Sequence, residues 1–197
     1  LVLMDWRMPG MNGDEATQHI HLDPAIPHQP KGVMVTHRNL VYSTQARGDY
    51  YGTPPLRFLL LSSFSFDSSV AGIFWTLAEG GCLFLLRPEQ QRDPFYVADV
   101  IAAQRITHLM CLPSFHAHIL EYAAAAHLQS LRTVIVAGEV CTPQHVHRHF
   151  AALPDSGLFN EYGPTECTVW STVYNCRALG DRPRVPIGRP IAATRID

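Results

Sequence analysis

Short apolar segments alternate with segments of helical pattern from residue 57 onwards, and this alternation constrains the fold more than any other feature of the sequence. Short apolar runs of this kind are typical of strands buried on both faces of a sheet. Strands that are each followed by a helix predict an α/β domain with a largely parallel sheet and layered helices. Strands are expected at residues 33–35, 57–61, 82–86, 108–112, 133–136, 158–160 and 168–174. Helices are expected after Thr36 and at residues 67–78, 94–104 and 113–126, with one more after its cap Thr142.

The composition is that of an ordinary globular protein and excludes several classes of function. The chain has 197 residues, of which 47% are hydrophobic and 16% charged, and a net charge of -2. This balance provides no electrostatic basis for binding nucleic acid or an acidic membrane surface. Five cysteines without a CxxC pair fit a reducing compartment, so we expect a cytoplasmic protein without a signal peptide. The apolar stretch 58–86 contains Asp67 and Glu79, which argues for strand, helix and strand instead of a membrane span.

Two loops lie at the carboxyl ends of expected strands, where parallel sheets bind ligands. The segment SFSFDSS places Asp67 at the start of a helix, where a carboxylate is also a common N-terminal cap. In the segment VIVAGEV, Ala137 and Gly138 leave the backbone open to a flat ring, although small residues also occur in ordinary turns.

A third loop, NEYGPTE, covers residues 160–166 and carries the most specific chemistry. Thr165 offers a hydroxyl to a phosphate oxygen and Glu166 offers a carboxylate to Mg²⁺. Tyr162 presents an aromatic face to a base. The alternative for this loop is an ordinary turn with an exposed acid.

Five segments resemble successive core motifs of nonribosomal peptide synthetase adenylation domains. The segments are PKGVMVTHRNL, FSFDSSV, AGE, NEYGPTE and VPIGRPI, and they occur in the order of that family. The resemblance covers about residues 31–197 and implies the α/β layers of the superfamily of acyl-CoA synthetases, adenylation domains and luciferases. It also implies ATP and Mg²⁺ as ligands, an amino acid as substrate and a peptidyl carrier protein as partner.

The resemblance further implies roles for individual residues. Asp67 pairs with the α-ammonium of the substrate, Thr165 contacts the α-phosphate and Glu166 holds Mg²⁺. The adenine lies beside Gly138, Glu139, Asn160 and Tyr162. The side-chain pocket falls on Ser68, Ala71, Cys111, Ile135, Ala137, Glu161, Val169 and Trp170.

The implied reaction is attack of the substrate carboxylate on the α-phosphorus of ATP, which expels pyrophosphate and leaves an aminoacyl-adenylate. Because two anions must approach each other, positioning and charge neutralisation are the main catalytic tasks. The small side chains of Ser68, Ala71 and Cys111 predict a roomy pocket, and Glu161 is placed to meet a polar or cationic group. These features predict a bulky amino acid with an aromatic or polar side chain.

The family's phosphate-gripping loop is missing before Pro30. Family members carry a Ser/Thr/Gly-rich loop there, whereas this sequence reads DPAIPHQ. Lys31 belongs to that loop region and is not the catalytic lysine of the family, which follows later in its members. We therefore expect that the chain alone forms no adenylate.

The front segment has a different resemblance. Residues 1–30 are similar to the middle of a two-component receiver domain, with Asp5 at the position of the phosphoacceptor. The acidic pair that holds the metal in receivers is absent. The sequence thus predicts a truncated receiver-like segment at 1–30 and a partial adenylation core at 31–197.

Two alternatives and a histidine cluster remain. An acyl- or aryl-acid CoA ligase shares the loop around Thr165, but a plain acid has no ammonium for Asp67. A phosphorelay module acting through Asp5 is the alternative from another class. The histidines of HVHRH are spaced by two residues, so we expect a solvated helix face and no metal site.

Overall fold

The computed structural model describes residues 32–192, 194 and 195. The receiver-like segment 1–30, with Asp5, and the phosphate-loop residue Lys31 lie outside the described residues. The roles of Asp5 and Lys31 therefore stay predictions.

Within the described residues, seven strands form one sheet, in the order β2-β1-β3-β4-β5-β6-β7. The first five of these are parallel to one another, and β6 and β7 are antiparallel to their neighbours. The strands are β1 (Arg57–Leu60), β2 (Cys82–Leu85), β3 (His108–Cys111), β4 (Thr133–Val136), β5 (Gly157–Tyr162), β6 (Thr172–Asn175) and β7 (Arg189–Pro190). The expected α/β class with a largely parallel sheet is confirmed.

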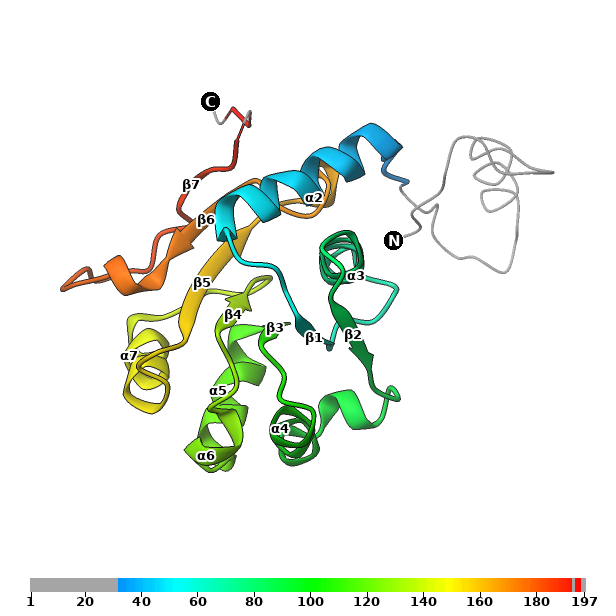
Figure 1. Ribbon diagram of the computed structural model, residues 1–197. Helices are drawn as coiled ribbons and strands as arrows, with labels where there is room; N and C mark the ends of the chain where they lie inside the picture. The colour runs from blue at the N-terminus through cyan, green and yellow to red at the C-terminus, as the bar shows by residue number, and fades with distance from the viewer. Residues whose placement is uncertain (1–31, 193, 196–197) are drawn as a thin grey trace, which may run out of the picture.

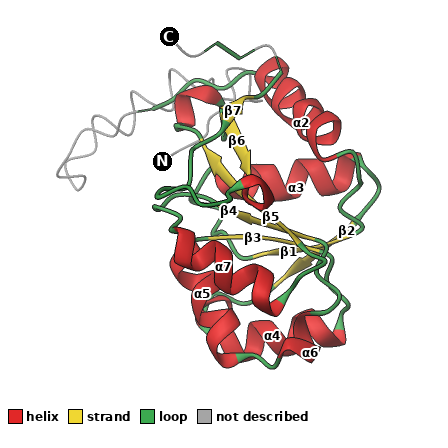
Figure 2. Cartoon of the chain, turned by 90° about the vertical axis from the view of Figure 1, so that its left-hand side faces the viewer, coloured by secondary structure: helices red, strands yellow, loops and turns green. Residues whose placement is uncertain are grey.

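Helices cover both faces of the sheet (Figures 1 and 2). One face carries α4 (Pro94–Ala103), α5 (Pro113–Tyr122), α6 (Ala125–Leu128) and α7 (Pro143–Ala152), and the other carries α2 (His37–Tyr51) and α3 (Ser68–Ala78). Short 3-10 turns occur at Gln90–Arg92, Thr165–Cys167 and Cys176–Ala178. The larger core lies under α4 to α7 and contains Leu59, Leu109 and Val134, all fully buried. A second core, under α3, contains Phe58, Trp75 and Ile135.

Caps and prolines set the helix starts as the sequence predicts. Thr36 forms a capping box with Asn39 at the start of α2, and Thr142 accepts a hydrogen bond from the backbone amide of His145 at the start of α7. Pro143 occupies the first turn of α7, where its missing amide costs nothing. Both caps were expected and both are confirmed.

Three expected elements differ in the structure. Residues 33–35 form no strand, because no strand of the described sheet pairs with them. The expected helix 113–126 ends at Tyr122, since Ala123 and Ala124 are extended, and α6 then follows. The expected strand 168–174 begins only at Thr172, because Thr168 and Val169 have positive φ angles of 59° and 83°.

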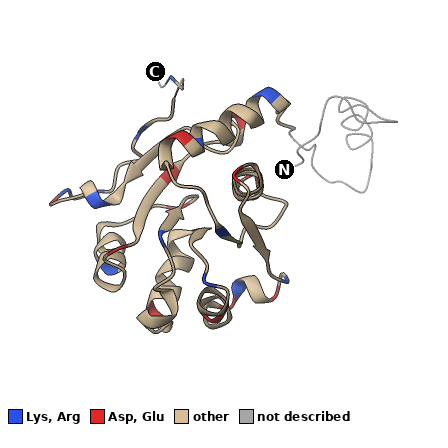
Figure 3. Ribbon diagram, in the orientation of Figure 1, with Lys and Arg blue, Asp and Glu red and all other residues tan. Residues whose placement is uncertain are grey.

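The apolar stretch 58–86 forms most of β1, then α3 and β2, as expected. No helix in the described part of the chain is both long and apolar enough to cross a membrane. All five cysteines are free thiols. In the view of Figure 3, basic and acidic positions are scattered over the elements, and neither sign forms a continuous stretch.

Candidate active site at the carboxyl edge of the sheet

The predicted site segments gather at one edge of the sheet because they follow parallel strands. The loop with Asp67 follows β1, Ala137 follows β4, and the loop that starts at Gly163 follows β5. Cys111 is the last residue of β3. This shared edge unites residues that lie almost 100 positions apart in the sequence.

Asp67 stands at the start of α3 but does not cap it. Its side chain accepts no hydrogen bond from the backbone amides of the first turn. Its Oδ2 atom is buried and has no hydrogen-bond partner among the described residues. Because no cap hydrogen bond forms, the expected capping role is wrong. A buried carboxylate oxygen without a partner is costly, so this atom is available to a ligand.

The residues expected to form the side-chain pocket divide into a rim and a closed interior. Ser68, Cys111, Ala137 and Val169 are half-buried, whereas Ala71, Ile135 and Trp170 are buried. Burial raises the pKa of the Cys111 thiol to about 12, with a smaller contribution from the Glu139 carboxylate. Cys111 is therefore a neutral wall of the site, and the roomy pocket expected from small side chains does not extend into the interior.

The loop after β4 turns sharply at Gly138. This residue has a φ of 86°, and a Cβ atom there would lie 3.1 Å from Cδ2 of Leu112. Glu139 is exposed, and its Oε2 accepts a hydrogen bond of 3.1 Å from the backbone amide of Ser114 in the first turn of α5. The loop therefore presents bare backbone at Gly138, while the Glu139 carboxylate fastens it to α5.

The loop between β5 and β6 is tightly folded around a glycine. A Cβ atom on Gly163 would lie 2.3 Å from the Cα of Trp170, so only glycine fits there. The backbone amide of Ser171 donates to the carbonyl of Tyr162 at 2.8 Å and closes the loop. Thr165 is half-buried, whereas Glu166 and Tyr162 are exposed. The hydroxyl and the carboxylate expected to meet phosphate and metal are thus accessible at this edge.

The chain around Val169 is strained. A positive φ is unfavourable for a β-branched residue, and Val169 follows Thr168, which also has a positive φ. Such conformations persist only where the surroundings impose them, and they concentrate at functional sites. Next to Val169, the backbone of Trp170 is packed against Gly163.

Asn160 and the segment 185–191 are connected. The buried side chain of Asn160 donates a hydrogen bond of 2.9 Å to the carbonyl of Pro186, and Thr172 donates one of 2.7 Å to the carbonyl of Ile187. Gly188, with a φ of 98°, lies directly against the Val173 carbonyl. Two motifs that lie far apart in the sequence therefore form one packed unit.

Glu161 is buried and already paired, contrary to the expectation that it meets a substrate group. Its Oε1 accepts from Nη1 of Arg47 at 2.6 Å, and its Oε2 accepts from Nη2 at 2.8 Å. The Tyr51 hydroxyl also donates to Oε1. Sequence reasoning missed Arg47 and Tyr51, since both lie in a helix more than 100 residues away and match no motif.

The histidines of HVHRH are only partly on a solvated face. His147 is exposed, but His145 and His149 are buried and face His116 of α5. The expectation of a solvated face is wrong for these two, because residues four apart share one helix face. The described residues contain no group of three side chains arranged to hold a metal ion.

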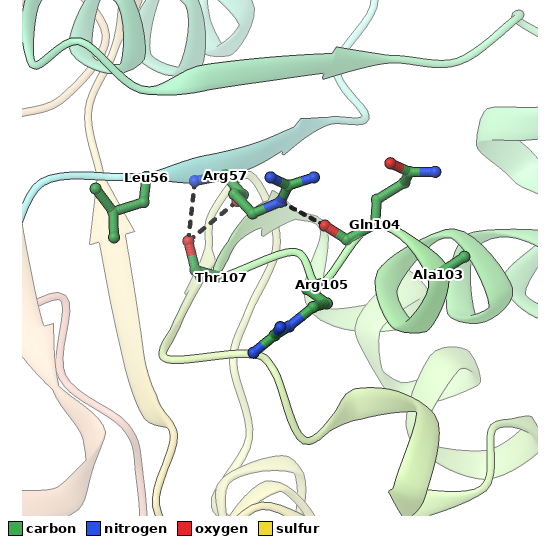
Figure 4. Close-up of a pocket in the computed structure, with 6 residues that line it drawn as sticks. All are labelled: Leu56, Arg57, Ala103, Gln104, Arg105 and Thr107. Carbon is green, nitrogen blue, oxygen red and sulfur yellow. Dashed lines mark hydrogen bonds between the residues drawn. The ribbon is translucent and has the colours of Figure 1, made fainter.

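A hollow of about 300 Å³ lies at the opposite edge of the sheet (Figure 4). It is lined by Leu56, Arg57, Ala103, Gln104, Arg105 and Thr107. These residues flank the amino ends of β1 and β3, and none was predicted to be a site residue. The hollow is therefore separate from the candidate site.

Both the sequence and the fold of this chain resemble those of known proteins. Residues 29–197 match the family model of the AMP-binding enzymes. The chain is 40% identical to bacitracin synthase 3 of Bacillus licheniformis, over 85% of this chain and 3% of that protein. It is 39% identical to the phosphinothricin tripeptide synthetase PhsB of Streptomyces viridochromogenes, over 85% of this chain and 14% of that protein.

Solved structures show the same fold. The AMPPNP-bound form of the nonribosomal peptide synthetase FmoA3 superposes with a TM-score of 0.78 and 28% identity, covering 84% of this chain and 18% of that chain. The Vibrio cholerae adenylation domain AlmE, solved in complex with glycyl-adenosine-5'-phosphate, superposes with a TM-score of 0.72 and 25% identity. The match covers 80% of this chain and 30% of that chain. The chain thus spans a small part of the relatives that it matches. With the family model matching most of its length, the chain belongs to the AMP-binding enzyme family.

Proposed function

We propose that this chain is the core of an adenylation domain, which activates an amino acid as its aminoacyl-adenylate for nonribosomal peptide synthesis. One observation carries the proposal: the Asp67 carboxylate has a buried oxygen without a partner, at the edge of the sheet that also carries the loop with Thr165 and Glu166. An α-ammonium group supplies the charge and the donors that this oxygen lacks.

The residues at this edge fit the two substrates. Gly138 offers open backbone to the adenine, and the exposed side chains of Glu139 and Tyr162 are available beside it. The buried Asn160 contributes by holding Pro186 in place. Thr165 is half-buried, and its hydroxyl is proposed to contact the α-phosphate. The amino-acid carboxylate attacks the α-phosphorus, a new C–O–P bond forms, and pyrophosphate leaves with the electrons of the broken P–O bond. The chain contributes by holding the two anions in line.

Glu166 is proposed to hold Mg²⁺. Its carboxylate is exposed beside Thr165, and Mg²⁺ usually takes one or two protein carboxylates together with phosphate oxygens. When bound, the ion neutralises charge on the phosphates. A single accessible carboxylate fits this role even though the described residues form no multi-residue metal cluster.

Asp67 also favours this function over that of an acyl- or aryl-acid CoA ligase. A carboxylic acid without an amino group would leave the buried Asp67 oxygen unpaired in the complex. An amino acid pairs it, so the amino-acid substrate is favoured.

A peptidyl carrier protein is proposed as the partner that receives the activated amino acid. The protein PA1221, which contains adenylation and PCP domains, superposes with a TM-score of 0.63 and 27% identity, covering 71% of this chain and 28% of that chain. A reducing cytoplasm is proposed as its location, and the five free thiols support this.

Amino-acid-dependent exchange of pyrophosphate into ATP, measured on the full-length protein that carries this sequence, tests the function. Glu166→Ala is expected to lower exchange by at least about 100-fold. Glu121→Ala, which removes an exposed carboxylate from α5, serves as the matched control and should leave exchange unchanged. Exchange driven by fatty or aryl acids, with all amino acids inert, would favour the CoA ligase.

Calorimetry on the isolated chain is the second test. Because the sequence before Pro30 lacks the phosphate-gripping loop, we expect weak or no ATP binding and no adenylate. Robust exchange by the isolated chain would contradict this expectation.

A further inference from the structure

A buried ion pair joins Arg47 of α2 to Glu161 of β5, a residue predicted to line the side-chain pocket. The side chains of Arg47 and Glu161 each keep only 1% of their surface exposed. Two parallel hydrogen bonds join them, and the Tyr51 hydroxyl supplies a third donor to the carboxylate. Both carboxylate oxygens are thus engaged, and the positive and negative charges cancel.

Aromatic rings enclose the pair. The guanidinium carbon of Arg47 lies 4.3 Å from the ring centroid of Trp170 and 5.9 Å from that of Trp75. The Tyr51 ring lies 5.0 Å from Trp75 and is stacked against Trp170 at 6.2 Å. Trp170 is further fixed because its indole nitrogen donates to the carbonyl of Ser43. A large group entering from the site would have to displace several packed rings.

The pair lies in line with Asp67. Asp67, Ala71 and Trp75 are four residues apart, so they follow one another along one face of α3. Asp67 stands at the open edge, Ala71 is buried one turn further, and Trp75 packs near the Arg47 guanidinium two turns further. A side chain that points inward from an ammonium group at Asp67 is therefore directed towards the pair.

We propose that Arg47 is a specificity-determining residue, which together with Glu161 closes the inner end of the side-chain pocket and restricts the enzyme to amino acids with small, uncharged side chains. This inference rests on the proposed adenylation function. It replaces the bulky substrate expected from the sequence. That expectation rested on the small side chains of Ser68, Ala71 and Cys111, and it treated Glu161 as free to meet a polar group.

Charge and volume both enforce the restriction. Glu161 is already neutralised by Arg47, so a cationic substrate side chain would have no partner in the interior. An anionic substrate side chain would also lack one, because Arg47 is already neutralised by Glu161. A bulky neutral side chain meets Trp170, which is 1% exposed. A side chain the size of alanine or serine avoids both costs.

The test is pyrophosphate exchange by the full-length protein with alanine, serine, leucine, phenylalanine, lysine and glutamate. For the wild type we expect alanine or serine to exceed each of the other four by at least about 10-fold. Preference for leucine, phenylalanine, lysine or glutamate would overturn the inference while leaving the adenylation function intact. No exchange with any amino acid would instead refute the adenylation function itself.

Two single substitutions then make opposite predictions. Glu161→Ala leaves an unpaired guanidinium and some room. Exchange with glutamate should therefore rise at least about 10-fold relative to exchange with alanine. Arg47→Ala leaves an unpaired carboxylate, so lysine should gain by a similar factor. If the pair had only a structural role, each substitution would lower pyrophosphate exchange with all amino acids by a similar factor. The ranking of the amino acids would then not depend on the charge of their side chains.

A double variant and a distant control complete the design. Arg47→Ala with Glu161→Ala leaves no unpaired charge, so it should remain folded even where a single variant does not, and leucine should gain relative to alanine. Arg57→Ala, which removes an arginine from the opposite edge of the sheet, should leave the order unchanged. Thermal melting of each variant verifies folding. An unchanged order in the folded double variant would overturn the inference.

Discussion

Nδ1 of His116 and Nε2 of His145 lie 3.1 Å apart in the interface between α5 and α7. His149, one turn further along α7, places its ring 5.3 Å from that of His116 and bonds through Nε2 to the carbonyl of Ser156. Three imidazoles thus share one buried interface. Burial lowers the pKa of each ring, and neighbouring imidazoles lower that of His116 further.

This interface predicts that the fold weakens in mild acid. The pKa of His149 is lowered from 6.5 to about 4, mainly by burial. Between these values the unfolded chain takes up a proton that the folded chain excludes, so stability is full above pH 6.5 and falls as the pH approaches 4. The loss for His149 alone is about 3 kcal/mol. Urea unfolding at pH 7 and pH 4.5 measures it.

Two variants assign this pH dependence to its source. His149→Gln keeps a donor for Ser156 and cannot titrate, so it should reduce the difference in unfolding free energy between the two pH values. His147→Gln, an exposed histidine on the same helix, should leave the difference unchanged. Part of the dependence will remain in both, because burial also lowers the pKa of His108 to about 4. Equal pH dependence in the wild type and His149→Gln would contradict this account.

Asp67→Ala is expected to separate activity from stability. Because Asp67 makes no cap hydrogen bond and has a buried oxygen without a partner, its removal should leave the free energy of unfolding unchanged or raise it. It should nevertheless abolish amino-acid-dependent pyrophosphate exchange. Asp93→Ala is the matched control: Oδ1 of Asp93 caps α4 by accepting from the amides of Phe95 and Tyr96. Its loss should cost about 1 kcal/mol without changing substrate dependence. A large loss of stability in Asp67→Ala would show that its carboxylate supports the fold.

Gly188→Ala is expected to destabilise the protein strongly. A Cβ atom there would lie 1.9 Å from the carbonyl oxygen of Val173, so the segment 185–191 must move off β6. Gly180→Ala controls for backbone strain, because Gly180 also has a positive φ but has open space around it. We expect a cost of roughly 3 kcal/mol at position 188 and about 1 kcal/mol at position 180, measured by thermal unfolding. Equal costs would show that the contact with Val173 has no effect.

Removal of the α2 cap is a further test of the fold. Thr36→Ala deletes the hydroxyl that accepts from the Asn39 amide, and should cost about 1 kcal/mol of unfolding free energy. Thr36→Ser retains the hydroxyl and should be close to wild type. Since α2 carries Arg47, a larger effect on exchange than on stability would indicate that the helix start also positions the pocket.

Local signals were sufficient for most of the fold. The strand 133–136 was predicted to the residue, because an apolar β-branched run lies between clear breaks. Thr36, Thr142 and Pro143 act on amides of their own helix, so their roles are visible in the sequence. The break at Ala123 was missed because alanine is a good helix former and gives no stop signal.

The missed features depend on partners distant in sequence. Glu161 pairs with Arg47 across 114 positions, and no spacing rule connects them. His116 meets His145 from another helix, so the pattern HVHRH alone could not reveal the cluster. The positive φ of Val169 occurs beside the contact between Gly163 and Trp170, which exists only in the folded loop.

The buried pair of Arg47 and Glu161 also constrains how this protein can diverge. Replacing one partner leaves an isolated interior charge, at a cost of about 3–5 kcal/mol, a large fraction of the stability of a typical domain. A single mutant is therefore rescued only by a substrate that carries the missing charge, whereas a change at both positions restores neutrality. Substitutions at positions 47 and 161 should accordingly occur together during evolution. The effect of either substitution on substrate preference then depends on the residue at the other position.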